Sequence, residues 1–310
     1  MSSRSELPGW CARSIPGLPP IRRARDFHLY DRNGARYLDL FQNGGGAILG
    51  HRQGNVSLEM KQVMARGVYA ELHSDYEERV RRAVARLLPE YDQVLVYASV
   101  FEAAHAVSEL SAGGAGRDAV QLLGRVPDPA LPADERLDAS DPPVRLWRPF
   151  VAEPPGGDRA EAVLPLLPFP MRNGPTVLCC GESLAARLPA SSPVSPVLLA
   201  GLARAADNLA TLGSDAVHHP ETPRHKPGKK RRTKYGPSWQ RFRHPLWRQN
   251  GPYIYPACDP IHYERVFEHF LGNRVILNPK YPGPSILPRY WSVGEHERFR
   301  RLSDAALDLL

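Results

Sequence analysis

The chain has 310 residues, of which 42% are hydrophobic and 24% are charged, and this is the composition of a folded globular protein. No apolar run approaches the about 20 residues that span a bilayer, and residues 1–17 lack the apolar core of a secretory signal. The formal net charge of +7 comes from ten basic residues between Arg224 and Arg248. The remaining 30 basic residues against 33 acidic ones leave the rest of the chain near neutral, unlike a dedicated nucleic-acid-binding domain.

The N-terminal quarter of the chain predicts a hairpin and two helices. Residues 26–42 read as two short strands around Asn33-Gly34, a pair that tolerates the positive φ of a tight turn. Apolar residues at helical spacing predict a helix over 55–66. A second helix is expected to begin at the capping box Ser74–Glu77 and to stop at Pro89.

The middle of the chain predicts a buried sheet. Residues 93–99 form an apolar run rich in β-formers, and a helix follows over 102–110. A strand, a short turn and a helix form the unit of sheets that place ligand chemistry at strand ends. Residues 111–145 show little periodicity and are expected to be a loop-rich connection. Residues 177–180 predict another buried strand, in which Cys179 and Cys180 fill space, and without any CxxC spacing we expect a reduced, cytoplasmic protein.

The C-terminal third predicts three helices and a strand. Pro196 opens a long helix that Gly213 is expected to end, and 214–250 form a basic segment broken by prolines. A helix begins at Asp259-Pro260, and residues 274–278 read as a strand. A second capping box, Ser292–Glu295, opens a terminal helix.

Three stretches, in the same order along the chain, resemble class III aminotransferases. The first joins Gly34–Leu40 to Gly44–His51, the second is Leu95–Ala104, and the third runs from Tyr263 to Glu295. Together they cover about half of the chain. The likeness is to members of the type that includes glutamate-1-semialdehyde aminomutase.

The resemblance implies an α/β protein of the pyridoxal-phosphate (PLP)-dependent transferase fold type I. It would have a shortened, mostly parallel sheet as its large domain and a small α+β lobe built from N- and C-terminal segments. The expected boundaries are 1–66 for the N-terminal segment of the small lobe with a linking helix, 67–213 for the reduced large domain, 214–250 for the basic insert and 251–310 for the C-terminal small domain. Such proteins are usually homodimers with cofactor sites at the subunit interface.

PLP chemistry requires a phosphate site, and the turn after 93–99 departs from the family's pattern. Where the family has Ser-Gly-Ser-Glu, this chain has Ser99, Val100, Phe101 and Glu102. Glycine lets the backbone approach a phosphate and serine donates a hydroxyl, whereas valine and phenylalanine do neither. We therefore expect this degenerate turn to exclude a phosphate.

PLP chemistry also requires a lysine for the Schiff base and a carboxylate for the pyridine nitrogen. Of the six lysines, none lies between Lys61 and Lys226. One alignment of Cys180–Pro189 with the family places Glu182 at the lysine position, and another places Gly181 at the position of the carboxylate. Both alignments remain open, and each lacks a required residue, so we assign no catalytic residue and expect no bound cofactor.

The basic segment offers a rival function. Lys229, Lys230, Arg231 and Arg232, with aromatic residues nearby, could contact a nucleic acid or another anionic partner, or they could belong to a solvated loop. The spacing of His218, His219, Glu221 and His225 matches no metal-site pattern, so no metal is expected. Three hypotheses follow: a binding or regulatory scaffold without PLP-dependent catalysis, an active aminotransferase or aminomutase with an atypical site, or a nucleic-acid-associated protein.

Overall fold

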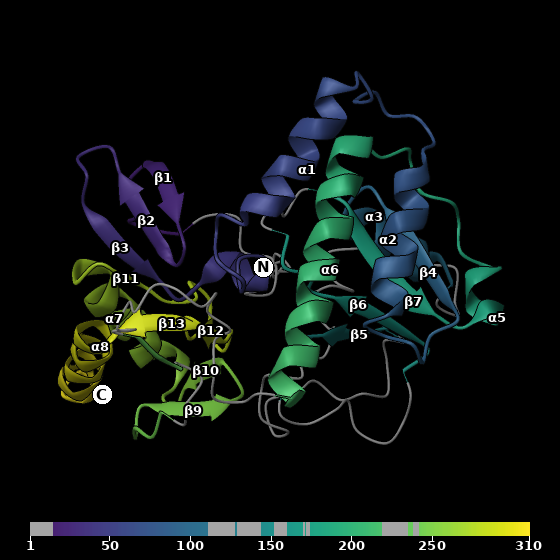
Figure 1. Cartoon of the computed structure of the whole chain (residues 1–310). Helices are drawn as coiled ribbons and strands as arrows, with labels where there is room; N and C mark the ends of the chain where they lie inside the picture. Colours follow the sequence, from purple (N-terminus) through teal and green to yellow (C-terminus); the bar gives the residue numbers. More distant parts are fainter. Residues whose placement is uncertain are drawn as a thin grey trace.

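A computed structural model of the chain describes residues 15–110, 128, 144–151, 160–169, 171, 174–218, 235–237 and 242–310. Two lobes lie side by side in Figure 1. The sheet lobe consists of the helices and strands between α1 and α6, and the small lobe combines the strands before α1 with the elements after α6. None of the described helices is long and apolar enough to cross a membrane.

The N-terminal part of the small lobe is a four-stranded sheet in the order β1-β2-β3-β11. Its strands are β1 (Ile21–Arg25), β2 (His28–Asp31), β3 (Arg36–Asp39) and β11 (Val275–Ile276). The predicted hairpin is β2–β3, and Gly34 adopts a φ of 81° in its turn, where Ala35 N–H donates to Asp31 Oδ1 at 2.8 Å. The parallel pairing of β3 with β11 joins the two ends of the sequence in one sheet.

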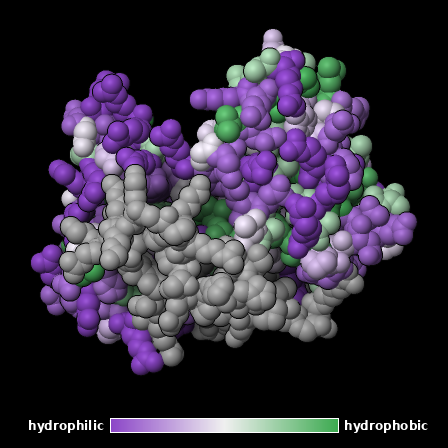
Figure 2. Space-filling view, viewed as in Figure 1, coloured by the Kyte–Doolittle hydropathy of each residue, from purple (hydrophilic) through white to green (hydrophobic). Residues whose placement is uncertain are grey.

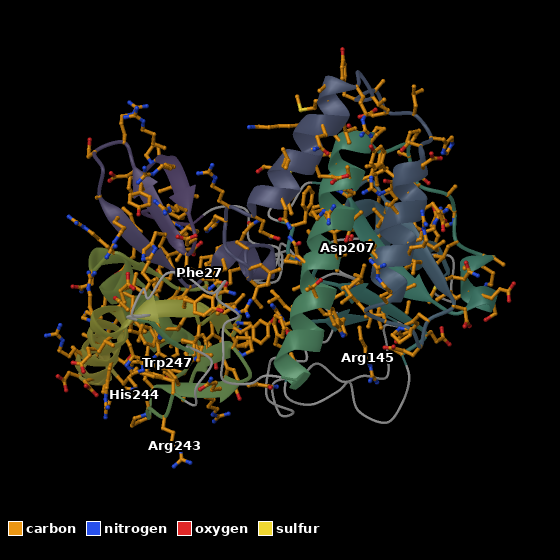
Figure 3. All side chains as sticks on the ribbon, viewed as in Figure 1. Phe27, Arg145, Asp207, Arg243, His244 and Trp247 are labelled. Atoms are coloured by element: carbon orange, nitrogen blue, oxygen red, sulfur yellow. The ribbon has the colours of Figure 1, made fainter. Side chains whose placement is uncertain are left out.

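The C-terminal part of the small lobe packs short strands against two helices. These elements are β8 (Tyr235–Pro237), β9 (Trp247–Asn250), β10 (Tyr253–Pro256), β12 (Ser285–Ile286), β13 (Tyr290–Ser292), α7 (Pro260–Gly272) and α8 (Val293–Leu307). Aromatic side chains form its core, in which the Trp247 ring lies 5.8 Å from that of Phe270 and 5.9 Å from that of Phe299. Figure 3 places Trp247 beside His244 in this lobe.

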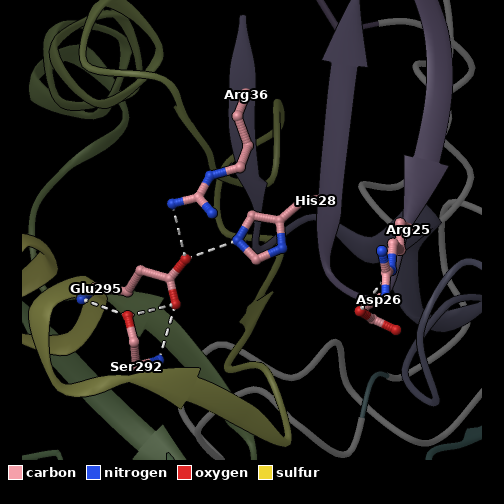
Figure 4. Close-up of polar contacts among 6 residues, drawn as sticks. All are labelled: Arg25, Asp26, His28, Arg36, Ser292 and Glu295. Atoms are coloured by element: carbon pink, nitrogen blue, oxygen red, sulfur yellow. Dashed lines mark hydrogen bonds and ion pairs between the residues drawn. The ribbon is translucent and has the colours of Figure 1, made fainter. Parts of the chain in front are cut away.

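Glu295 connects the two parts of the small lobe. Its carboxylate completes the predicted capping box with Ser292 and also contacts His28 of β2 at 2.8 Å and Arg36 of β3 at 3.4 Å (Figure 4). Glu295, the third residue of α8, therefore both completes the cap of this helix and attaches it to the N-terminal sheet.

The sheet lobe contains a four-stranded sheet in the order β4-β7-β6-β5. Its strands are β4 (Gln93–Tyr97), β5 (Val144–Trp147), β6 (Ala162–Pro165) and β7 (Thr176–Cys180). Both neighbours of β7 are antiparallel to it, and β5 and β6 are parallel. Strands β4, β5 and β6 thus run in one direction, but the expectation of a mostly parallel sheet needs correction. The reversed β7 lies between β4 and β6 and leaves β5–β6 as the one parallel pair among the described strands of this sheet.

Alternate residues of the strands face two hydrophobic cores. On one face Val94, Val96, Val177 and Cys179 pack with α2 (Asp75–Ala85) and α6 (Pro196–His218). On the other face Tyr97, Leu178 and Cys180 pack with α3 (Val100–Leu110) and α5 (Glu182–Ala185). The two adjacent cysteines are fully buried on opposite faces, so both fill core space as expected.

Helices α1 (Gly54–Ala65), α2 and α6 form one layer over the sheet (Figure 1). The long helix α6 continues through Gly213 to His218, so the expected end at Gly213 is wrong. Glycine in a helix interior costs only about 1 kcal/mol relative to alanine, which the residues after it can offset. The expected α/β architecture with a small lobe from both ends of the chain is confirmed.

Candidate functional site

Three strands of the sheet lobe end at the same edge of their sheet, and we call this the carboxyl edge. Register pairs Tyr97 at the end of β4 with Thr176 at the start of β7, whereas Gln93 pairs with Cys180 at the opposite edge. Strands β5 and β6 run parallel to β4, so their last residues, Trp147 and Pro165, also lie at the carboxyl edge. Ligand sites of α/β sheets form at such edges.

The turn Ser99–Glu102 lies at this edge and leads into α3. Ser99 Oγ accepts from Glu102 N–H at 3.2 Å, so the serine caps the start of the helix. The side chains of Val100 and Phe101 pack against the core that contains Tyr97 and Leu164.

The carboxylate of Glu102 is the centre of a hydrogen-bond cluster. It accepts from Ala98 N–H at 3.0 Å, from Ser192 N–H at 2.6 Å, and from the hydroxyls of Ser192 at 2.8 Å and Ser191 at 3.3 Å. Burial raises the pKa of Glu102, but the hydrogen bonds from Ser192, Ala98 and Ser191 outweigh it and leave this pKa below its ordinary value. The ionised carboxylate therefore draws segment 191–192 onto the turn.

This arrangement does not fit a phosphate group. The donors nearest to the turn already serve an internal carboxylate, whose negative charge would repel a second anion. The apolar side chains of Val100 and Phe101, the first residues of α3, pack against the core and offer no donor.

Glu182 is not brought together with this turn. It is exposed at the start of α5, directly after β7 ends at the opposite edge of the sheet. The four residue steps of β4 separate the two edges by roughly 13 Å. Gly181, the position of the alternative alignment, precedes Glu182 at this far edge. Neither residue therefore lies beside the Ser99–Glu102 turn, although both belong to the sheet lobe.

Arg148, which the sequence analysis missed, lies at the carboxyl edge immediately after β5. Its guanidinium forms a fork with the carboxylate of Asp128, with 2.6 Å from Nε to Oδ1 and 2.5 Å from Nη2 to Oδ2. The two side chains are 1% and 8% exposed. Burial lowers the pKa of Arg148, but the Asp128 carboxylate more than offsets this, so the pKa stays above its ordinary value. The charged residue directly after an apolar strand was the one signal in the sequence for Arg148. Its pairing with Asp128 could not be predicted, because a partner 20 residues away produces no local sequence pattern.

The described lysines, Lys61 and Lys280, belong to none of the strands or turns that form the carboxyl edge. Lys61 is exposed on α1, and Lys280 follows β11 in the small lobe, where its N–H donates to Asn278 Oδ1 at 3.0 Å. Lys226 and Lys234 lie outside the described residues, as do the four predicted anion contacts Lys229, Lys230, Arg231 and Arg232. The hypothesis of a nucleic-acid contact therefore stays a prediction.

No group of three or more histidine, cysteine, aspartate or glutamate side chains could hold a metal ion within the part of the chain that the structure describes. The predicted histidine-rich stretch, with His219, Glu221 and His225, falls outside that part. The cysteines of β7 are poor ligands as well, because burial raises the pKa of Cys179 to about 12 and that of Cys180 to about 11.

Comparison with known sequences finds relatives along most of the chain. An uncharacterized protein of Treponema pallidum is 26% identical over 299 residues, which cover 86% of this chain and 88% of that protein. The glutamate-1-semialdehyde 2,1-aminomutase of Herminiimonas arsenicoxydans is 31% identical over 109 residues, which cover 35% of this chain and 26% of the enzyme. No protein-family profile matches the sequence.

Solved structures match nearly the whole fold at low sequence identity. A glutamate-1-semialdehyde aminomutase from Pseudomonas aeruginosa superposes with a TM-score of 0.63 at 13% identity, covering 97% of this chain and 90% of that one. An omega-transaminase from Sphaerobacter thermophilus gives a TM-score of 0.60 at 13% identity, covering 95% of this chain and 92% of that one. The chain therefore has the fold of the class III, PLP-dependent aminotransferases, as the three stretches of its sequence predicted.

Proposed function

We propose that this chain is a cytoplasmic, aminotransferase-like protein without PLP-dependent catalysis that acts as a binding or regulatory scaffold. The observation that carries the proposal is the absence of any lysine between Lys61 and Lys226, the stretch that contains every strand of the sheet lobe. No lysine of this stretch is available to form an imine with the aldehyde of PLP. When bound in such a fold, that group supplies an electron sink for reactions at an amino acid.

The turn at the carboxyl edge supports the same proposal independently. The Glu102 carboxylate holds the local donors, and Val100 and Phe101 are packed into the core. A protein that retained PLP as a non-covalent ligand would need a replacement phosphate site, and these residues do not supply one. The protein keeps the fold, but the polar and apolar groups described at its carboxyl edge contact other parts of the same chain.

Absorbance spectroscopy of the purified protein with added PLP tests the proposal. We expect no imine band after dialysis and no mass increase after borohydride reduction, with a lysine-dependent aminotransferase treated in parallel as the positive control. A borohydride-stable adduct would overturn the proposal. Peptide mapping would then locate the adduct. A variant with Lys226, Lys229, Lys230 and Lys234 all changed to alanine would show whether the basic segment supplies the amine.

We also propose that the protein is a homodimer. The apolar tip of the sheet lobe supports this assembly, and we define it as Leu58, Met64, Val68, Tyr69 and Leu72. These side chains on α1 and in the α1–α2 connection are between 40% and 64% exposed. Figure 2 shows several green residues among purple ones at the top of this lobe. Monomeric proteins rarely expose large contiguous apolar patches, and a second copy of the chain would cover this one.

A further inference from the structure

Arg148 contacts the small lobe as well as its own. Beyond the fork with Asp128, Nη1 donates to the backbone carbonyl of Gly44 at 3.3 Å. The guanidinium carbon lies 5.0 Å from the centre of the Tyr253 ring, on strand β10. All three nitrogens of the guanidinium are therefore engaged, and two of the contacts come from segments that belong to the small lobe.

The residues beside Arg148 continue this joint between the lobes. Tyr253 Oη donates to Pro149 O at 2.9 Å. Gly251 passes so close to the chain that an added Cβ would stand 2.0 Å from Phe150 O. Ile48, Tyr253 and Ile286 form a buried apolar cluster against which Phe150 packs. Three residues that follow β5 thus meet the small lobe within one short stretch.

The segment that presents Gly44 is itself held in an unusual conformation. It begins with the short helix η2 (Gln42–Gly45), and φ is 47° at Gln42 and 51° at Asn43, where side chains other than glycine are uncommon. Gln42 Nε2 donates to Ile286 O at 2.8 Å, which anchors the segment to strand β12. Residues other than glycine keep a left-handed conformation only where neighbouring groups hold them in it. Arg148, which donates to Gly44 O, is one of the groups that hold this segment.

We propose that the Asp128–Arg148 ion pair is a lock that holds the two lobes in one arrangement across the carboxyl edge. Two buried charges cost desolvation that apolar residues of similar volume would avoid, so the pair is a weak choice for stability alone. The pair instead fixes the orientation of the Arg148 guanidinium. The two-point fork of Asp128 fixes the plane of the guanidinium, and that plane points Nη1 at Gly44 and lays the cation over Tyr253.

Hydrogen exchange of the full chain tests the lock. The variants are Asp128→Asn, which keeps the size but loses the charge, and Arg148→Lys, which keeps the charge but loses the fork. We expect exchange at residues 42–50 and 253–255 to become faster by on the order of a hundredfold in both variants. Exchange at residues 199–209 of α6, remote from the joint, should stay within about twofold of the unchanged chain.

A chemical rescue separates the ionic lock from simple packing. In Asp128→Ala the guanidinium loses its partner, and formate, a carboxylate small enough for the vacated space, should slow the exchange at 42–50 again, whereas chloride at equal ionic strength should not. The exposed pair Glu78–Arg82 on α2 provides the matched control, and Glu78→Gln should change neither segment.

Three results would overturn the proposal. One is unchanged exchange at 42–50 and 253–255 in both Asp128→Asn and Arg148→Lys. Another is an equal acceleration at 199–209, which would assign the pair to global stability rather than to the joint. The third is rescue of Asp128→Ala by chloride as well as by formate. Should Asp128→Ala not fold, the first two measurements on the conservative variants still decide.

Discussion

Glu102 illustrates how a single carboxylate shapes the carboxyl edge. It accepts from the Ala98 and Ser192 N–H groups, and an alanine side chain offers no acceptor in its place. Ala98 N–H would keep Ser191 Oγ as an acceptor at 2.9 Å, but Ser192 N–H would lose the carboxylate. Because a donor left without its partner costs about 1–3 kcal/mol, we expect Glu102→Ala to lower the free energy of unfolding by that amount in urea titrations. Glu109→Ala, at an exposed position of the same helix, should change it by less than about 0.5 kcal/mol. Equal effects of the two variants would show that the cluster contributes nothing.

Gly251 allows a second comparison between single residues. Gly251 and Gly34 have positive φ values of 56° and 81°, but an added Cβ at Gly251 would collide with Phe150 O at 2.0 Å, whereas nothing lies within 4 Å of one at Gly34. Gly34→Ala should therefore cost only the backbone strain, about 1 kcal/mol, and Gly251→Ala should cost more than about 3 kcal/mol because the lobes must move apart. Thermal unfolding of both variants measures the difference. Similar melting temperatures would contradict the close approach of the lobes.

Among the elements, two helices began where a capping box was predicted, but only one box forms. At α8 Ser292 and Glu295 exchange both hydrogen bonds. At α2 Ser74 makes no capping bond with its side chain, and Glu77 instead faces His73 and Arg81, each at 3.5 Å. The local pattern predicted the start of each helix, whereas the choice of partner for Glu77 depends on neighbouring charges that compete with the cap.

The position of Glu295 gives the terminal helix a pH-dependent attachment. Burial raises the pKa of Glu295, but hydrogen bonds from His28 and Ser292 outweigh it and lower the pKa from 4.5 to about 2. A carboxylate whose pKa is lower in the folded state than in the unfolded state stabilises the fold when the pH is above the unfolded-state pKa. This contribution is therefore present above about pH 4.5 and is lost as the pH falls toward 2. At about 1.4 kcal/mol per unit, it amounts to about 3 kcal/mol.

Urea titrations from pH 6 to pH 3 measure this attachment. We expect Glu295→Gln to remove about 3 kcal/mol at pH 6 and progressively less toward pH 3, so that the stability curves of the two proteins converge in acid. Glu268→Gln, at an exposed position on α7, is the control and should leave the curve unchanged. Parallel curves for Glu295→Gln and the unchanged chain would contradict the role of the carboxylate.

The sequence predicted the longer elements of the fold better than the short ones. The hairpin, α7 and β4 carried clear periodicity, turn residues or caps. Strands β5 and β6 are four residues each, and β6 is buried at every position and so lacks any alternation. Strand β9 (Trp247–Asn250) was not predicted, and its residues were assigned to the basic segment. They form a strand through their pairing with β10. Such pairing between short segments leaves no local signal.

For the candidate site, too, local features could be predicted from the sequence, whereas contacts between distant residues could not. The Ser99–Glu102 turn follows a recognisable strand, so its place at a strand end could be predicted. Its partners Ser191 and Ser192 are 89 and 90 residues away, and Asp128 and Arg148 are 20 apart. Glu182 was assigned from likeness of sequence, but the edge of the sheet at which it lies depends on the reversed direction of β7, which only the folded sheet determines.

For the whole molecule, the apolar tip makes assembly the most direct quantity to measure. We expect light scattering on a size-exclusion column to give twice the mass of one chain. The double variant Tyr69→Ser with Leu72→Ser removes two side chains that are each 64% exposed, and their loss should weaken the dimer by on the order of a hundredfold. At micromolar concentration this variant should elute as a monomer with an unchanged circular dichroism spectrum.

A matched double variant on the small lobe makes this prediction specific. Ile261 on α7 and Val293 at the start of α8 are 76% and 66% exposed, so Ile261→Ser with Val293→Ser removes a similar apolar area far from the tip. That variant should remain dimeric, because a dimer formed through α1 leaves the helices of the small lobe in solvent. A monomeric wild-type protein would overturn the homodimer. Dissociation by the small-lobe variant alone would assign the contact to the small lobe. Dissociation by the tip variant alone would support a dimer in which the sheet lobes of two chains contact each other through their apolar tips. In each chain, the carboxyl edge would still be filled by side chains of that same chain.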